Sequence, residues 1–161
     1  MGIVRNHYVG RTFIQPSQKN RNLAVKVKLN PVNKLIKNKR IVLVEDSIVR
    51  GTTSKVRIRA LRESGAKEIH MRVSCPPLIS PCFFGIDFPT AKELIASGRT
   101  VEKIRKFIGL DSLGYLSLDG MLKSMPINKS TFCTACFTKN YPITVENGQD
   151  KLCLERNNPK R

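Results

Sequence analysis

The sequence predicts an α/β protein built on a parallel sheet with flanking helices. Residues 41–44 (Ile-Val-Leu-Val) form a short, continuous, mostly β-branched run, which is typical of a strand buried on both faces. A helical segment at about 53–64 follows, and Gly65 is placed to end it. Residues 68–73 predict a second strand. A strand, a helix and a strand in this order form a βαβ unit, in which the two strands run parallel.

The other elements follow from shorter patterns on either side of this unit. Thr90 and Glu93 have the spacing of a capping box, and Thr100 and Gly109 have the positions of an N-cap and a C-terminal stop. In chain order, we expect a polar mobile loop at 15–22, a half-exposed strand at 25–29, helices at 90–97 and 101–108, a short strand at 115–118, a brief helix at 119–123 and a chain end with little pattern after residue 141.

The charge of the chain is strongly positive. Lys and Arg number 29 against 12 Asp and Glu, for a net charge of +17. Nucleic acid is the first partner that such a charge suggests, and an anionic small substrate is the second. The basic residues are dispersed, however, and no aromatic side chains interleave with the richest stretches at 19–28 and 34–40. Because single-stranded RNA is normally bound by stacking on exposed aromatics, we do not expect nucleic acid as the main partner.

The sequence contains no signal for a membrane or for secretion. No apolar run approaches the roughly 20 residues that span a bilayer. The first residues, Met-Gly-Ile-Val-Arg-Asn-His, lack the apolar core of a signal peptide. We therefore expect a cytoplasmic protein without a membrane partner.

Residues 41–53 (Ile-Val-Leu-Val-Glu-Asp-Ser-Ile-Val-Arg-Gly-Thr-Thr) carry the clearest chemical signal. A buried strand delivers Glu45 and Asp46 to its carboxyl end, where ligands of open α/β sheets bind. A tight turn containing Gly51 then leads into a helix N-terminus, whose amides and dipole favour a phosphate. Acidic side chains just before it can accept hydrogen bonds from a ribose diol. The alternative is an ordinary strand–turn–helix, with Asp46 ending the strand and Thr53 acting as a cap.

The five cysteines have one close pair. They occupy positions 75, 82, 133, 136 and 153, and only Cys133 and Cys136 are spaced as C-x-x-C. In a protein of the cytoplasm, such cysteines suggest metal or redox chemistry before disulfides. By itself, one C-x-x-C pair leaves zinc binding and no metal equally open.

Several segments in one order resemble a single enzyme family. The segment 41–53 closely resembles the phosphoribosyl-pyrophosphate (PRPP) motif of the type I phosphoribosyltransferases, and residues 5–16 (Arg-Asn-His-Tyr-Val-Gly-Arg-Thr-Phe-Ile-Gln-Pro) are similar to the flexible catalytic loop of the amidophosphoribosyltransferases. The resemblance covers about residues 2–142. It continues through the segments 61–67, 76–77, 81–87, 93–96, 111–116 and 132–137.

The resemblance implies a fold, an activity and a set of site residues. The fold would be part of the type I phosphoribosyltransferase fold, with a small helical or irregular C-terminal extension. The family's enzyme forms 5-phosphoribosylamine from PRPP and glutamine in the first step of purine (IMP) biosynthesis. Glu45 and Asp46, where the family usually has Asp-Asp, would hold the ribose hydroxyls and help to place Mg²⁺. The 5′-phosphate would be bound by Ser47, Val49, Arg50, Gly51, Thr52 and Thr53, and the loop that closes over PRPP would contain Arg5, Tyr8 and Arg11.

The resemblance also implies a metal cluster and further partners. Some members hold a [4Fe–4S] cluster with four Cys thiolates. Cys82, Cys133 and Cys136 match three of these ligands, and the fourth lies upstream of the matched segment, whereas Cys75 and Cys153 match none. Purine nucleotides as feedback inhibitors and a homo-oligomer are also implied. Among the histidines, His70 in a strand is interpreted as structural, and His7 in the mobile loop is a possible PRPP contact.

The domain organisation expected from this resemblance is partial. Residues 1–125 would form part of a phosphoribosyltransferase domain, with a mobile loop at about 5–22 and the PRPP loop at 41–53, and residues 126–161 a cysteine-containing extension. No counterpart of the family's glutaminase domain, or of the upstream half of its phosphoribosyltransferase domain, is recognised. We therefore interpret the chain as a fragment without glutamine-dependent activity of its own. The alternatives are a catalytically inactive PRPP- or nucleotide-binding regulatory module and a basic RNA-binding remnant.

Overall fold

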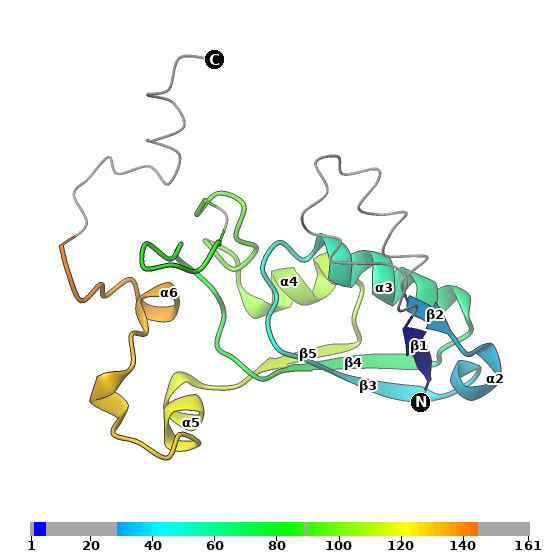
Figure 1. Cartoon of the computed structure of the whole chain (residues 1–161). Helices are drawn as coiled ribbons and strands as arrows, with labels where there is room; N and C mark the ends of the chain where they lie inside the picture. Colours follow the sequence, from blue (N-terminus) through cyan, green and yellow to red (C-terminus); the bar gives the residue numbers. More distant parts are fainter. Residues whose placement is uncertain (1, 6–28, 89, 145–161) are drawn as a thin grey trace, which may run out of the picture.

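A three-stranded parallel sheet forms the centre of the molecule (Figure 1). The computed structural model describes residues 2–5, 29–88 and 90–144. Strands β3 (Arg40–Glu45), β4 (Glu68–Val73) and β5 (Ser112–Tyr115) lie in the order β3-β4-β5. Ile41 pairs with Ile69, and Met71 with Leu113. Helix α3 (Thr52–Glu63) connects β3 to β4, so the predicted βαβ unit and its parallel sheet are confirmed.

Smaller elements surround the sheet. Strand β1 (Ile3–Arg5) pairs antiparallel with β2 (Leu29–Pro31). Helix α4 (Val101–Ile108) precedes β5. The remaining elements are α2 (Asn33–Ile36), α5 (Leu118–Lys123), a 3₁₀ turn η2 (Lys129–Thr131) and α6 (Ala135–Thr138). Of the strand expected at 25–29, only Leu29 is described, and the loop expected at 15–22 lies outside the described residues.

The predicted helix ends are confirmed for α3 and α4. Thr100 caps α4, and its hydroxyl accepts a hydrogen bond of 3.3 Å from the Lys103 amide. Gly109 ends this helix with φ +90°, and Gly65 follows α3 with φ +84°. Both glycines adopt the left-handed conformation that commonly terminates helices.

The prediction of a helix at 90–97 is wrong, because this segment consists of turns. Part of the capping box is present, since the Thr90 hydroxyl donates to the Glu93 carboxylate over 3.3 Å. Three consecutive residues, Leu94, Ile95 and Ala96, are nevertheless buried. A helix that covers a core from one side buries residues spaced three or four apart, so tertiary packing prevails over the local signal here.

The strand expected at 115–118 begins three residues earlier than predicted. Asp111, just before β5, accepts a hydrogen bond of 2.6 Å from the Ile69 amide on β4. This contact sets the point at which the chain joins the sheet, and pairing then continues from Ser112 to Tyr115. The brief helix expected at 119–123 is observed as α5, one residue longer.

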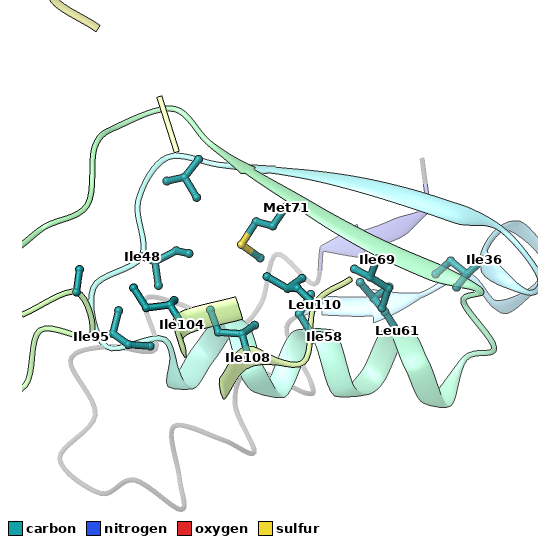
Figure 2. Packing of buried hydrophobic residues seen from close by; sticks show 12 residues of the cluster. Ile36, Ile48, Ile58, Leu61, Ile69, Met71, Ile95, Ile104, Ile108 and Leu110 are labelled. Atoms are coloured by element: carbon teal, nitrogen blue, oxygen red, sulfur yellow. The ribbon is translucent and has the colours of Figure 1, made fainter. Parts of the chain in front are cut away.

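The core lies between the sheet and two helices (Figure 2). Ile58 and Leu61 of α3 and Ile104 and Ile108 of α4 pack against one face of the sheet. On the sheet side, Ile69, Met71 and Val73 point into this layer, since alternate residues of β4 are buried. None of the helices in the described ranges is long and apolar enough to cross a membrane.

The expectation that β3 is buried on both faces is wrong. Ile41 and Leu43 pack against the core, whereas Val42 and Val44 are 62% and 76% exposed. Helices α3 and α4 both lie on the same side of the sheet (Figure 1). The other face of β3 therefore remains uncovered in the described part of the chain.

Ile104→Ala is expected to lower the free energy of unfolding by about 2–5 kcal/mol, because it removes a fully buried side chain and leaves a cavity. Urea denaturation followed by circular dichroism measures this loss. Val101→Ala on the same helix is the control, since Val101 is 39% exposed. Equal losses for the two variants would contradict the described packing of α4.

Candidate functional site

The loop that follows β3 places an acidic side chain at the carboxyl edge of the sheet. Asp46 is exposed, and its Oδ1 accepts hydrogen bonds from the Ser47 amide at 2.5 Å and the Ser47 hydroxyl at 3.3 Å. Ile48, two residues further on, is buried in the core and anchors the loop. Asp46 is thus fixed in place by its neighbour while its carboxylate remains open to solvent.

Gly51 brings the loop to the start of α3. It has φ +73°, and a Cβ atom at this position would lie 2.4 Å from Cδ1 of Ile95. In the described chain, no side chain caps the N-terminus of α3 and no acidic residue lies in its first turn. The first amides of α3 and the positive end of its dipole are therefore suited to an anion such as a phosphate. Thr52 and Thr53 add two hydroxyls at this helix end.

The segment 90–97 supports the loop from the other side. The Ile95 amide donates to the Val49 carbonyl over 2.8 Å. Arg50 pairs with Glu93 at 2.9 Å. Burial opposes the ionisation of Glu93, but the hydrogen bond and charge of Arg50 outweigh it and hold the pKa of Glu93 below its usual range. The loop is therefore fixed by one backbone and one side-chain contact to a distant part of the chain.

Glu45 and Asp46 occupy different environments despite being adjacent. Glu45 is the last residue of β3 and faces the helix layer, where its carboxylate forms an ion pair with Arg57 of α3. The side chains of Arg57 and Glu45 are 22% and 17% exposed. Burial lowers the pKa of Arg57, and its Nε has no hydrogen-bond partner among the described residues. Of the two predicted acidic ligands, only Asp46 has a carboxylate free of an ion pair in the described chain.

Three cysteines of the predicted cluster lie in one region of the chain. Residues 79 and 80 donate their amides to the Cys136 carbonyl, at 2.9 and 3.1 Å, and so hold α6 in place. Burial raises the pKa of the Cys136 thiol, and the nearby thiols of Cys82 and Cys133 raise it further. Cys75 also lies near this group, and its pKa is raised to about 11, mainly by burial and then by Asp46 and Cys136.

These thiols do not fit a metal cluster in the described structure. No group of three or more His, Cys, Asp or Glu side chains among residues 2–5, 29–88 and 90–144 is arranged to hold a metal ion. The four described cysteines are free thiols.

The remaining predicted residues lie elsewhere or outside the described chain. Arg5 is the last residue of β1, whereas Tyr8, Arg11 and His7 lie outside the described residues. His70 lies on β4, where its ring nitrogens contact the Ser112 hydroxyl at 2.9 Å and the Glu68 carboxylate at 3.0 Å. The structure thus brings together the residues from 45 to 53 and does not describe how the loop at 5–22 relates to them.

The sequence analysis did not predict three residues of this site, namely Arg57, Glu93 and Ile95. Arg57 lies three residues after Ser54 and therefore on nearly the same face of α3, but the burial of this face is seen only in the structure. Glu93 and Ile95 are more than 40 residues from the loop that they support. No sequence spacing indicates such contacts.

The fold and the loop define a class of protein: an α/β protein with a candidate anion site at the carboxyl edge of a parallel sheet.

Comparisons with known proteins identify the particular relatives. The chain is homologous to one segment of the amidophosphoribosyltransferases. It is 56% identical over 144 residues to the enzyme of Methanocaldococcus jannaschii, covering 89% of this chain and 30% of that protein. It is 51% identical over 150 residues to a chloroplastic amidophosphoribosyltransferase of Glycine max, covering 93% of this chain and 26% of that protein.

A solved structure gives the same relationship. The chain matches the glutamine PRPP amidotransferase from B. subtilis complexed with ADP and GMP, with a TM-score of 0.76 and 48% identity. The match covers 92% of this chain and 33% of that structure. No protein-family model matches the chain. The chain thus spans about a third of the length of its relatives, and within that third it has their fold.

Proposed function

We propose that the loop at 46–53 binds Mg-PRPP and that this chain supplies the PRPP-binding part of an amidophosphoribosyltransferase. In this role it would take part in forming 5-phosphoribosylamine from PRPP and glutamine, the first step of purine biosynthesis. The observation that carries the proposal is that one short loop joins the exposed Asp46 at the end of β3 to the N-terminus of α3, which no side chain caps in the described chain. The chain is homologous to a segment that makes up about a third of the length of amidophosphoribosyltransferases. This homology supports the choice of PRPP over other anions.

Each part of the loop has a role in this proposal. The amides at the start of α3, with the hydroxyls of Thr52 and Thr53, bind the 5′-phosphate. The Asp46 carboxylate accepts hydrogen bonds from the ribose hydroxyls and is a hard oxygen ligand within reach of the Mg²⁺ of the substrate. Glu45 stays paired with Arg57 and supports the loop from behind.

The proposed transfer requires an attack at C1 of the ribose. Ammonia would form the new C–N bond as pyrophosphate leaves, and Mg²⁺ bound to the pyrophosphate lowers the charge that develops on it. Release of ammonia from glutamine is assigned to the part of the relatives that this chain does not span. We therefore expect glutamine alone to support no transfer by the isolated chain.

Asp46→Asn is expected to weaken Mg-PRPP binding by about tenfold or more, because hydrogen bonds to a charged acceptor contribute about 1.5–3 kcal/mol and 1.4 kcal/mol corresponds to tenfold in affinity. Isothermal titration calorimetry of the full chain with Mg-PRPP measures this change. The matched control is Asp119→Asn on α5, where the carboxylate pairs with Lys123. Absence of saturable binding by a folded wild-type chain, or equal affinities of all three proteins, would refute the proposal.

A second candidate is a regulatory module that binds a purine nucleotide at the same loop. The B. subtilis relative was solved with ADP and GMP bound, and a nucleoside monophosphate carries the same ribose 5-phosphate as PRPP. Competition calorimetry separates the two candidates. Tighter binding of GMP than of Mg-PRPP would favour the regulatory module, and the reverse order favours the enzyme part.

A further inference from the structure

The start of α3 carries a positive side chain that is unfavourable for the helix itself. Lys55 lies in the first turn, where its amide donates to the Gly51 carbonyl over 2.9 Å. The positive end of the helix dipole lies in the same turn, so that acidic residues stabilise this position and a cation does not. The first turn of α3 has no acidic residue. The charge of Lys55 is therefore placed where it can stabilise a bound anion and not the helix.

A second cation lies at the same aromatic ring as Lys55. The Lys55 Nζ is 4.4 Å from the centroid of the Phe107 ring, and the guanidinium carbon of Arg99 is 5.9 Å from it. Neither cation forms an ion pair with a carboxylate of residues 2–5, 29–88 or 90–144. Because two like charges at one ring repel each other, the arrangement becomes more favourable when an anion binds beside them.

The ring connects these cations to the candidate site. Phe107 belongs to α4, and its Cε1 lies 3.5 Å from the position that a Cβ atom of Gly51 would occupy. Gly51 is the turn residue that precedes the first amides of α3. The Phe107 ring therefore holds the ammonium group of Lys55 close to the amides that are proposed to bind the 5′-phosphate.

The arginine of the loop itself does not supply this charge. Arg50 pairs with Glu93 at 2.9 Å, so its positive charge is largely compensated. A phosphate monoester carries about −1.5 to −2 charges at neutral pH. The amides and hydroxyls of residues 51–53 are neutral donors, whereas Lys55 and Arg99 each offer a full positive charge.

We propose that Lys55, held by the Phe107 ring and assisted by Arg99, selects ligands with a doubly charged 5′-phosphate at this loop. Its ammonium group donates a charge-assisted hydrogen bond to the phosphate. The bound phosphate also removes the repulsion between Lys55, Arg99 and the positive end of the α3 dipole. This inference rests on the proposed binding of Mg-PRPP by the loop.

Lys55→Gln is expected to weaken Mg-PRPP binding about three- to tenfold and to raise the melting temperature of the unliganded chain. Binding weakens because the phosphate loses a charged donor, and stability rises because a neutral side chain no longer opposes the helix dipole and Arg99. Calorimetry of the full chain with Mg-PRPP at low salt and thermal denaturation without ligand measure the two effects. Lys55→Arg is expected to retain most of the affinity, since it keeps the charge.

The matched control is Lys67→Gln, which removes the same charge elsewhere. Lys67 is exposed and precedes β4, so it lies at the edge of the sheet opposite the loop. Its affinity for Mg-PRPP is expected to stay unchanged. Raising the salt concentration from about 0.01 M to about 1 M shortens the Debye length from about 30 Å to about 3 Å. The difference in affinity between the wild-type chain and Lys55→Gln is therefore expected to shrink at high salt.

The outcomes separate this inference from the proposed function. If the wild-type chain binds Mg-PRPP and Lys55→Gln binds equally well, or loses no more affinity than Lys67→Gln, the inference is overturned and the proposed function stands. A lowered melting temperature together with a salt-independent loss of affinity would identify Lys55 as a structural residue and would also overturn the inference. Absence of Mg-PRPP binding by the folded wild-type chain would overturn both.

Discussion

Gly51→Ala is expected to lower the free energy of unfolding by about 2–5 kcal/mol and to abolish measurable Mg-PRPP binding. Gly51 has φ +73°, and a left-handed conformation costs an L-residue roughly 1–2 kcal/mol. The new methyl group would also lie 2.4 Å from Cδ1 of Ile95, and overpacking a core costs typically about 1–3 kcal/mol. Because Ile95 is buried and its amide is bonded to Val49, relief of this clash displaces the loop itself.

Two variants isolate the clash from the backbone strain. Gly98 has φ +78°, and apart from its chain neighbours no atom of the described residues lies within 4 Å of a Cβ added there. Gly98→Ala therefore carries the strain alone and is expected to cost only about 1–2 kcal/mol. Ile95→Val removes the methyl group that the new Cβ would meet. In the Gly51→Ala background it is therefore expected to recover part of the stability, although alone it destabilises. Urea denaturation and Mg-PRPP calorimetry of the variants measure both effects. Equal costs at positions 51 and 98 would contradict the close packing of the loop.

Arg57→Met is expected to destabilise the chain by about 3 kcal/mol, at the lower end of the range for breaking a buried ion pair because both side chains are partly exposed. The loss arises mainly from Glu45, whose half-buried carboxylate is left without its partner. The matched control is Arg59→Met on the same helix, where the pair with Glu63 is exposed and contributes at most about 1 kcal/mol.

The double variant Arg57→Met with Glu45→Gln tests the origin of this loss. It is expected to be less destabilised than the sum of the two single variants, since it removes both charges together. Chemical denaturation at neutral pH gives the coupling free energy. Additive effects would show that Arg57 and Glu45 act independently and that the pair does not support the loop.

The sequence predicted most of the fold that positions the site. The β-branched run before Glu45, the strand at 68–73 and the capped helices are local patterns, and they are sufficient for a βαβ unit. The helix at 90–97 could not be excluded from Thr90 and Glu93 alone. In the structure this segment consists of turns, and its backbone and side chains contact Val49 and Arg50, more than 40 residues away in the chain.

For the candidate site too, the sequence determined one part and the tertiary structure decided the other. The sequence by itself determined which residues form the loop at 45–53, because an acidic strand end, a glycine and a helix start are contiguous. Only the tertiary structure decided that Asp46 is open while Glu45 is paired with Arg57, and that Val42 and Val44 face outward. The physical reason is that residue type and spacing fix local geometry, whereas burial and ion pairing depend on which distant elements cover each face of the sheet.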